Sequence, residues 1–126
     1  MKIAYIAGPY RAPTVFGLTE NIQRAREVAA EFWRMGYAVI CPHMNSALMD
    51  GVVPDGMFLA GYREFIRRMR AGDVFVLLPG WQKSSGTKAE AALAFSRGLT
   101  IVEWLAVEKK PRKLARAGVR IVEAFA

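Results

Sequence analysis

The chain has 126 residues, of which 53% are hydrophobic and 23% are charged, a composition that predicts one globular domain over residues 1–126 and excludes a disordered chain. Its single cysteine, Cys41, excludes a disulfide framework within the chain and favours a reducing, cytoplasmic location, and no apolar run is long enough to predict a membrane span. The net charge of +7 is compatible with a solvated surface or with an anionic ligand, either a nucleotide or a nucleic acid.

The N-terminal third of the chain predicts a strand, a helix and a second strand. The apolar run at residues 2–7 ends at a Gly-Pro pair, which indicates a buried strand rather than a signal peptide. After a loop with two prolines, Thr19 can cap a helix that ends at Gly36. Apolar side chains recur in this helix with a period of about 3.6: Ile22, Ala25, Val28, Ala29, Phe32 and Met35. Residues 37–41 predict a second buried strand.

The middle of the chain begins with a Gly/Pro-rich segment at residues 42–58. It is longer than an ordinary loop, which indicates a functional or mobile segment, although part of it can be helical. A second amphipathic helix is predicted at residues 58–70, with these apolar positions: Phe58, Leu59, Tyr62, Phe65, Ile66 and Met69. Residues 73–79 form the third and most hydrophobic predicted strand.

The C-terminal part begins with a Gly/Ser-rich turn at residues 80–87. A helix at residues 86–97 and a fourth strand at residues 100–105 follow. The basic tail then predicts a short helix after Pro111, and residues 119–125 can form a fifth strand or a docking segment.

Strands and helices alternate along the chain, and the strands are continuous apolar runs. This pattern predicts an α/β domain with a Rossmann- or flavodoxin-like three-layer fold and a four- or five-stranded, mainly parallel sheet. Ligands of such folds bind beyond the carboxyl ends of the strands, so we expect the binding site in the turns after the first three strands. The candidate substrate-binding residues there are Gly8, Pro9, Arg11, His43, Asn45, Ser84, Ser85 and Gly86.

The turn at residues 80–87 and the helix after it combine a possible anion site with a lone carboxylate. Backbone N–H groups at a helix start, together with hydroxyls, can bind an anion, although Ser84 or Ser85 can equally be an ordinary N-cap. Glu90 is expected in about the first turn, among small apolar neighbours that can keep it out of bulk water. A carboxylate beside an anion site can attack an anomeric carbon and form a covalent glycosyl-enzyme. The alternative is a Glu that only stabilises its helix.

Three further residues each have a structural and a functional interpretation. Tyr5, in the middle of the first strand, has the position of a core aromatic. Arg11 can pair with a phosphate or remain a solvated loop residue. His43 is the only histidine and has no Cys/His partners, so we expect no metal site. It can contact a ligand, donate a proton or bond a backbone group, and we favour the last interpretation.

Two spacings give the chain its resemblance to a known group: Tyr5-Gly8-Arg11 and Ser84-Gly86-Glu90. The first spacing has a strand Tyr three residues before a loop Gly and an Arg three residues after that Gly. The second has a Ser six residues and a Gly four residues before a helical Glu. Over residues 1–104 the chain resembles the nucleoside 2-deoxyribosyltransferase-like superfamily. The likeness is greatest to its small uncharacterised branch, related to the 2'-deoxynucleoside 5'-monophosphate N-glycosidases.

The resemblance implies that Glu90 is the nucleophile at C1′ of a deoxyribose and that Tyr5 positions or tunes it. It also implies a 5'-phosphorylated substrate, because members with Ser at the position of Ser84 tend to bind a 5'-phosphate. A serine hydroxyl can donate to a phosphate, whereas an Asp would repel it. The implied partner is a deoxynucleoside monophosphate, with no cofactor, and a second subunit completes each site in a homodimer or higher homo-oligomer.

The chain departs from the family pattern in the second predicted helix. The family usually has an Asp eight residues ahead of Asp73, where this chain has Phe65, and Glu64 faces another side of an ideal helix. The group that contacts the sugar hydroxyl or protonates the leaving base therefore has several candidates: Asp50, Asp55, Glu64 and His43.

These observations support three hypotheses of unequal strength. The leading one is cleavage of the N-glycosidic bond of a 2'-deoxynucleoside 5'-monophosphate, by hydrolysis or deoxyribosyl transfer. The alternative is a non-catalytic nucleotide-binding or sensory module on the same fold, which the missing Asp favours. A nucleic-acid-associated protein is the weakest, because the basic clusters at residues 67–70 and 109–116 lack interleaved aromatics that stack on bases, so no nucleic acid partner is expected.

Overall fold

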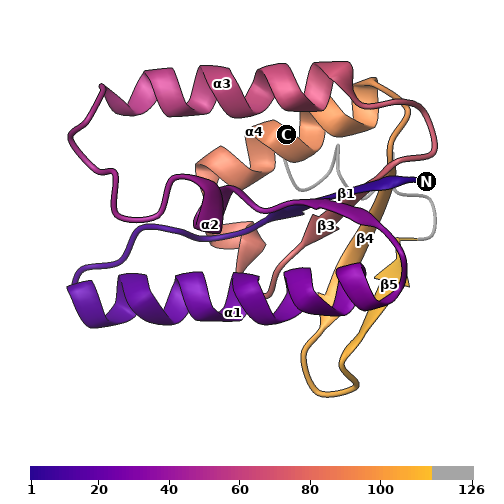
Figure 1. Ribbon diagram of the computed structural model, residues 1–126, viewed down its shortest axis with the longest axis horizontal. Coiled ribbons are helices and arrows are strands. Elements are labelled where there is room, and N and C mark those ends of the chain that lie inside the picture. Colours follow the sequence, from indigo (N-terminus) through magenta and orange to yellow (C-terminus); the bar gives the residue numbers. More distant parts are fainter. Residues whose placement is uncertain (115–126) are drawn as a thin grey trace.

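Five strands form one mixed sheet in the order β2-β1-β3-β4-β5 in the computed structural model, which describes residues 1–114 (Figure 1). Four of them are parallel, namely β1 Ile3–Ala7, β2 Ala38–Ile40, β3 Val74–Leu77 and β4 Thr100–Leu105. The fifth, β5 Lys110–Lys113, runs antiparallel to β4. The predicted α/β fold with a mainly parallel sheet is confirmed. The chain order reverses between β1 and β3, which is where ligands bind in open α/β sheets.

Helices cover both faces of the sheet and give the predicted three layers (Figure 1). Helix α1 Val15–Arg34 lies on one face, and α3 Asp55–Arg68 packs beside α4 Ser85–Ser96 on the other. A single helical turn, α2 Pro42–Asn45, follows β2, and a 3₁₀ turn, η1 Trp81–Lys83, precedes α4. Part of the predicted loop at residues 42–58 is therefore helical. Within the described part of the chain, no helix is both long and apolar enough to cross a membrane.

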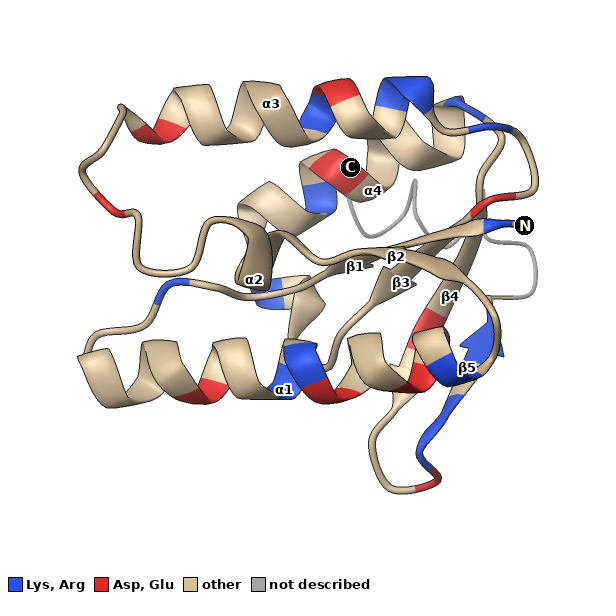
Figure 2. Cartoon of the chain, viewed as in Figure 1, with Lys and Arg blue, Asp and Glu red and all other residues tan. Residues whose placement is uncertain are grey.

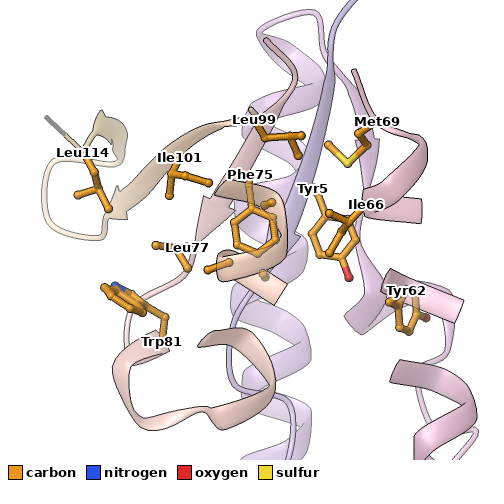
Figure 3. Close-up of a cluster of buried hydrophobic side chains, with 13 residues drawn as sticks. Tyr5, Tyr62, Ile66, Met69, Phe75, Leu77, Trp81, Leu99, Ile101 and Leu114 are labelled. Atoms are coloured by element: carbon orange, nitrogen blue, oxygen red, sulfur yellow. The ribbon is translucent and has the colours of Figure 1, made fainter. Parts of the chain in front are cut away.

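The side chains of β1 alternate between two core clusters, one on each face of the sheet. Ala4 and Ile6 pack on the side of α1, whereas Tyr5 and Ala7 pack on the side of α3 and α4. Figure 3 shows the second cluster, in which the Tyr5 ring stacks on Phe75 with centroids 5.4 Å apart. The core thus fixes the Tyr5 ring, and its hydroxyl lies at the border of the cluster, on the side of Tyr62 (Figure 3).

The helix starts differ from the sequence prediction because their caps lie elsewhere. Thr14, not Thr19, caps α1: its Oγ1 accepts a hydrogen bond from the Gly17 amide at 3.0 Å. Thr19 lies inside the helix and donates to the Val15 carbonyl. Helix α3 begins at Asp55, directly after Pro54, and so includes three residues that the prediction left in the loop.

Both edges of the sheet also correct the prediction. Strand β2 is half-buried rather than buried, because it has a neighbour on one side only. The start of the helix predicted after Pro111 is wrong, because residues 110–113 form β5 and Arg112 is ion-paired with Glu103 of β4, while the residues beyond 114 lie outside the described part of the chain. Pairing with β4 outweighs the local helix preference of this basic segment. The strand or docking segment predicted at residues 119–125 lies outside the described residues.

Asp73 joins the start of β1 to the turn that leads into β3. Its carboxylate is buried and accepts hydrogen bonds from the Ile3 amide at 2.9 Å and the Arg70 amide at 2.7 Å. Both donors are backbone groups that would otherwise lack a partner close to the core. Asp73 therefore has a structural role at the amino-terminal edge of the sheet, opposite the strand ends that carry the candidate site.

Replacing Asp73 with Ala should lower the free energy of unfolding by about 2–4 kcal/mol, because two backbone donors lose their acceptor. Urea denaturation followed by circular dichroism measures this loss. The matched control is Glu64→Ala, which removes an exposed ion pair with Arg68 and should change stability by less than about 1 kcal/mol. Equal stability of the two variants would contradict the role of Asp73.

Candidate active site

A cavity of about 440 Å³ lies at the carboxyl edge of the sheet, where β1 and β3 end. Its walls come from the loop after β1, from α2, from the first two turns of α3, and from η1 with the start of α4. The fold thus brings together the three turns that the sequence analysis identified. The predicted site residues that line this cavity are Tyr5, Gly8, Pro9, Arg11, His43, Ser84, Ser85, Gly86 and Glu90.

A hydrogen bond joins the two candidate catalytic residues, since the Tyr5 hydroxyl donates to Oε2 of Glu90. Tyr5 is fully buried on β1, and Glu90 is half-buried at the sixth residue of α4, which begins one residue before the predicted start. Ala91 and Ala94 are completely buried beneath the same helix. Their small side chains let α4 lie close to the sheet, and this close packing places the Glu90 carboxylate at Tyr5.

Burial shifts the titration of both partners. It raises the pKa of Glu90, while the hydrogen bond from Tyr5 and the positive charge of Arg63 act in the opposite direction. The pKa of Tyr5 is raised as well, first by burial and then by the adjacent Glu90 carboxylate. Tyr5 therefore keeps its proton and donates a hydrogen bond to Glu90, which is the acceptor.

The start of α4 forms one end of the cavity. Ser84 is its N-cap, as the structural interpretation of this residue predicted: its Oγ accepts from the Thr87 amide at 3.2 Å and from the Thr87 hydroxyl at 2.9 Å. Because this oxygen accepts twice, the Ser84 hydroxyl hydrogen is free to point toward a ligand. Ser85 and Gly86 follow at the first helical positions, whose N–H groups have no acceptor within the helix. This end of the cavity is suited to an anion.

The loop after β1 passes so close to Leu78 that only glycine fits. A Cβ on Gly8 would lie 2.6 Å from the Cβ of Leu78, which is itself buried. The Leu78 amide also donates to the Ala7 carbonyl at 2.8 Å, so backbone contacts hold the two segments together. Gly8 thereby places Pro9 along the cavity wall.

His43 is buried and bonds the backbone of this same loop, which is the interpretation favoured from the sequence. Its Nε2 lies 2.9 Å from the Pro9 carbonyl oxygen, and because a carbonyl only accepts, Nε2 carries the hydrogen. The Tyr10 ring packs edge-on against the imidazole, with the two ring centroids 5.8 Å apart. Burial lowers the pKa of His43, so the neutral ring is favoured and holds the loop in place.

Arg11 and Asn45, two predicted ligand contacts, have other partners. The Arg11 guanidinium lies 2.6 Å from the Asp55 carboxylate at the start of α3. Asn45 does not line this cavity. It lies in a second groove with Trp33 and Phe65, and its side-chain amide donates to the Tyr62 hydroxyl at 3.3 Å. The sequence analysis placed His43 and Asn45 in one site. The four-residue helix α2 instead places His43 in the cavity and Asn45 in the second groove.

The structure reduces the number of residues that could replace the Asp that the family usually has at the position of Phe65. Asp50, Asp55 and His43 line the cavity, but Glu64 is exposed on α3 and bound to Arg68 at 2.9 Å. Phe65, which occupies the family's Asp position, lies in the second groove.

Several lining residues were missed by the sequence analysis, namely Tyr10, Phe58, Leu59, Tyr62, Lys83 and Thr87. Of these, Tyr62 fastens α2 to α3, because its hydroxyl lies 2.5 Å from Ser46 Oγ and 3.3 Å from the Pro42 carbonyl. The amphipathic pattern identified Tyr62 as a core position but gave no sign of this polar contact. Lys83 and Tyr10 lie in the turns after the third and first strands, where the sequence analysis expected the binding site. Their place in these turns was the signal that could have identified them as lining residues. Among residues 1–114, no group of three or more His, Cys, Asp or Glu side chains is placed to hold a metal ion.

The fold and the cavity define an α/β domain with a cleft, lined by both apolar and charged side chains, at the reversal point of a mainly parallel sheet. Residues 1–103 match the family described as "Domain of unknown function (DUF4406)", and the chain belongs to this family. The match includes all residues that line the cavity. A search of curated proteins found no match. The chemistry must therefore be argued from the cavity itself.

The raised pKa of Glu90 predicts a stability gain when its charge is removed. A raised carboxyl pKa means that the folded state loses stability as pH rises above the ordinary value of 4.5, because the desolvated group must ionise. Glu90→Gln keeps an oxygen that can accept from Tyr5 and should raise Tm at neutral pH, with the gain shrinking as pH falls through the acid range. Thermal unfolding at a series of pH values from about 4 to 8 measures this change in Tm.

Glu64 provides the control with the opposite sign. The hydrogen bond and charge of Arg68 lower the pKa of Glu64, so Glu64→Gln should give no gain in Tm at neutral pH. A pH-independent difference between Glu90→Gln and the wild type would show that desolvation of the carboxylate is not its cause.

Proposed function

We propose that the protein cleaves the N-glycosidic bond of a 2'-deoxynucleoside 5'-monophosphate, with Glu90 as the nucleophile at C1′. The observation that carries the proposal is the Tyr5–Glu90 hydrogen bond in a cavity that also contains the N-terminus of α4. A volume of about 440 Å³ is within the range of small-ligand sites. A carboxylate and an anion-binding helix start thus face the same space.

The spacing along α4 suits a sugar phosphate. Glu90 follows Ser85 by five residues, which corresponds to about 7.5 Å along a helix axis. This separation is on the order of that between C1′ and the 5'-phosphate in a nucleotide. A phosphate at Ser84, Ser85 and Gly86 would therefore leave the anomeric carbon near the Glu90 carboxylate.

The reaction proceeds through two displacements at C1′. A Glu90 carboxylate oxygen forms a bond to C1′ while the C1′–N bond breaks, and the base leaves with the electron pair and takes up a proton. Asp50 and Asp55 line the wall from which an acid or a water molecule would supply this proton. In the second step water, or a ring nitrogen of another base, bonds to C1′ and gives up a proton to the Asp50 or Asp55 carboxylate or to solvent, while the ester to Glu90 breaks. The carboxylate is regenerated and the configuration at C1′ is retained.

Tyr5 acts on the nucleophile rather than on the sugar. Its hydroxyl donates to Glu90 and opposes the effect of burial, so it favours the ionised carboxylate that attacks. The stacked Phe75 ring fixes Tyr5, which in turn fixes one oxygen of Glu90. The other oxygen is available for C1′.

The sequence resemblance supports the same chemistry. The residues that resemble the deoxyribosyltransferase-like pattern and also line the cavity are Tyr5, Gly8, Arg11, Ser84, Gly86 and Glu90. The serine at position 84 favours a phosphorylated substrate over a free nucleoside, since its hydroxyl hydrogen is free. A homodimer or higher homo-oligomer, with a partner residue at each site, remains a prediction of this resemblance.

A non-catalytic nucleotide-binding module is the second candidate, and position 65 favours it. The family Asp is replaced by Phe65, which lies in the second groove, and the neighbouring Glu64 is bound to Arg68. Nucleic acid is a weaker ligand, because many of the basic residues lie on the C-terminal end of α3 and on β5 (Figure 2), whereas Arg11 and Lys83 are the basic side chains that line the cavity within residues 1–114.

Incubation with the four 2'-deoxynucleoside 5'-monophosphates, with chromatography for free base, tests the proposal. Glu90→Ala should lower kcat by roughly 10³-fold or more, because it removes the nucleophile. Glu64→Ala, outside the cavity, should keep wild-type activity. Nucleotide binding without base release by the wild type, unchanged in Glu90→Ala, would establish the binding module instead.

Tyr5→Phe separates positioning from general damage to the fold. We expect roughly 10²-fold lower kcat, since one hydrogen bond to the reacting carboxylate is lost. Because that bond lowers the pKa of Glu90, the acid limb of the pH–rate profile should also move to higher pH. An unchanged acid limb would contradict the role of Tyr5 in tuning Glu90.

A further inference from the structure

We propose that Lys83 is the cationic side chain that pairs with the 5'-phosphate of the substrate, and that Arg11 is held by Asp55 instead. This inference rests on the proposed function, because it assigns the phosphate end of that same substrate. It also replaces the expectation from the sequence, in which Arg11 had this role.

The wall that carries Arg11 is unsuited to a dianion. Arg11 is already neutralised by Asp55 at 2.6 Å. Asp50 lies on the same wall, where its carboxylate accepts from the Tyr10 hydroxyl at 3.0 Å. A phosphate placed here would meet two carboxylates and would have to break an ion pair to gain one cation.

Lys83 lies on a different wall, which η1 and the start of α4 form. It is the last residue of η1 and lines the cavity together with the three residues that follow it, Ser84 to Gly86. Within residues 1–114 it forms no ion pair. Its charge is therefore available to a ligand at the start of α4.

The turn that carries Lys83 is fixed on both sides. Gly80 precedes η1 with a φ of 86°, a conformation that favours glycine, and Trp81 is buried in the core cluster next to α4. Ser84 then caps α4. The backbone at Lys83 is thus held between a buried anchor and a helix cap, while its long side chain is exposed and can reach the anion.

The three kinds of donor at this end act together on a phosphate. The helix start offers N–H groups, Ser84 offers a hydroxyl hydrogen, and Lys83 adds a full positive charge. All three lose their partner when the ligand has no phosphate, and Lys83 brings the full positive charge among them. Removal of Lys83 is therefore expected to weaken the binding of a nucleotide while leaving the binding of the matching nucleoside unchanged.

Equilibrium binding and steady-state kinetics of Lys83→Ala test this assignment. The variant should bind 2'-deoxynucleoside 5'-monophosphates about 10- to 100-fold more weakly and raise their KM by a similar factor. Its kcat and its affinity for the matching nucleosides should stay unchanged. Lys83→Arg should retain most of the nucleotide affinity, and the effect of Lys83→Ala should decrease with added salt.

Two control variants make the result specific. Lys88→Ala removes the same charge from α4 at a position that does not line the cavity, and it should bind nucleotide like the wild type. Arg11→Ala should weaken nucleotide binding less than Lys83→Ala does. The reverse order of these two effects would overturn the inference.

Measuring binding separately from base release distinguishes this inference from the proposed function. If the wild type binds nucleotide through Lys83 but releases no base, the assignment of Lys83 is supported and the proposed glycosidic reaction is contradicted. If base is released and Lys83→Ala behaves like the wild type, the proposed glycosidic reaction is supported and the assignment of Lys83 is contradicted. A wild type that binds no nucleotide overturns both.

Discussion

The hydrogen bond between Tyr5 and Glu90 connects the interior strand β1 to α4, and the geometry of the cavity depends on it. Tyr5 is fixed by its stacking on Phe75, and α4 is held against the sheet through Ala91 and other small buried residues. The carboxylate therefore has the rigidity of the core rather than that of a loop. The same helix begins at the turn that Ser84 caps, so one packed element sets the distance between this turn and the Glu90 carboxylate.

Burial favours the neutral form of two groups in this cavity, by shifting their pKa values in opposite directions. It raises the pKa of Glu90 and lowers the pKa of His43. For His43 the neutral ring is the form that bonds the Pro9 carbonyl, so burial and structure agree. For Glu90 the charged form is the one that the proposed reaction needs, and the hydrogen bond from Tyr5 offsets part of the effect of burial on its pKa. A conflict of this kind between stability and ionisation is typical of functional sites.

The net charge of the chain says little about its cavity. Although the sequence carries +7, the cavity wall includes the carboxylates of Asp50, Asp55 and Glu90. The excess of positive charge lies largely on the C-terminal end of α3 and on β5 (Figure 2). The charge inside the cavity is therefore set by a few local side chains, among them the ion pair of Arg11 with Asp55, and not by the net charge of the chain.

The sequence by itself determined the four parallel strands and the helices between them, because a strand covered on both faces must be a continuous apolar run. It also directed attention to the strand ends and to Glu90. Only the tertiary structure decided that Thr14 caps α1, that the segment around Pro111 pairs with β4, that Asp55 binds Arg11, and that Asn45 faces another groove. Periodicity is a local property of the chain, whereas the partner of a polar side chain or an edge strand is set by segments that only folding brings together.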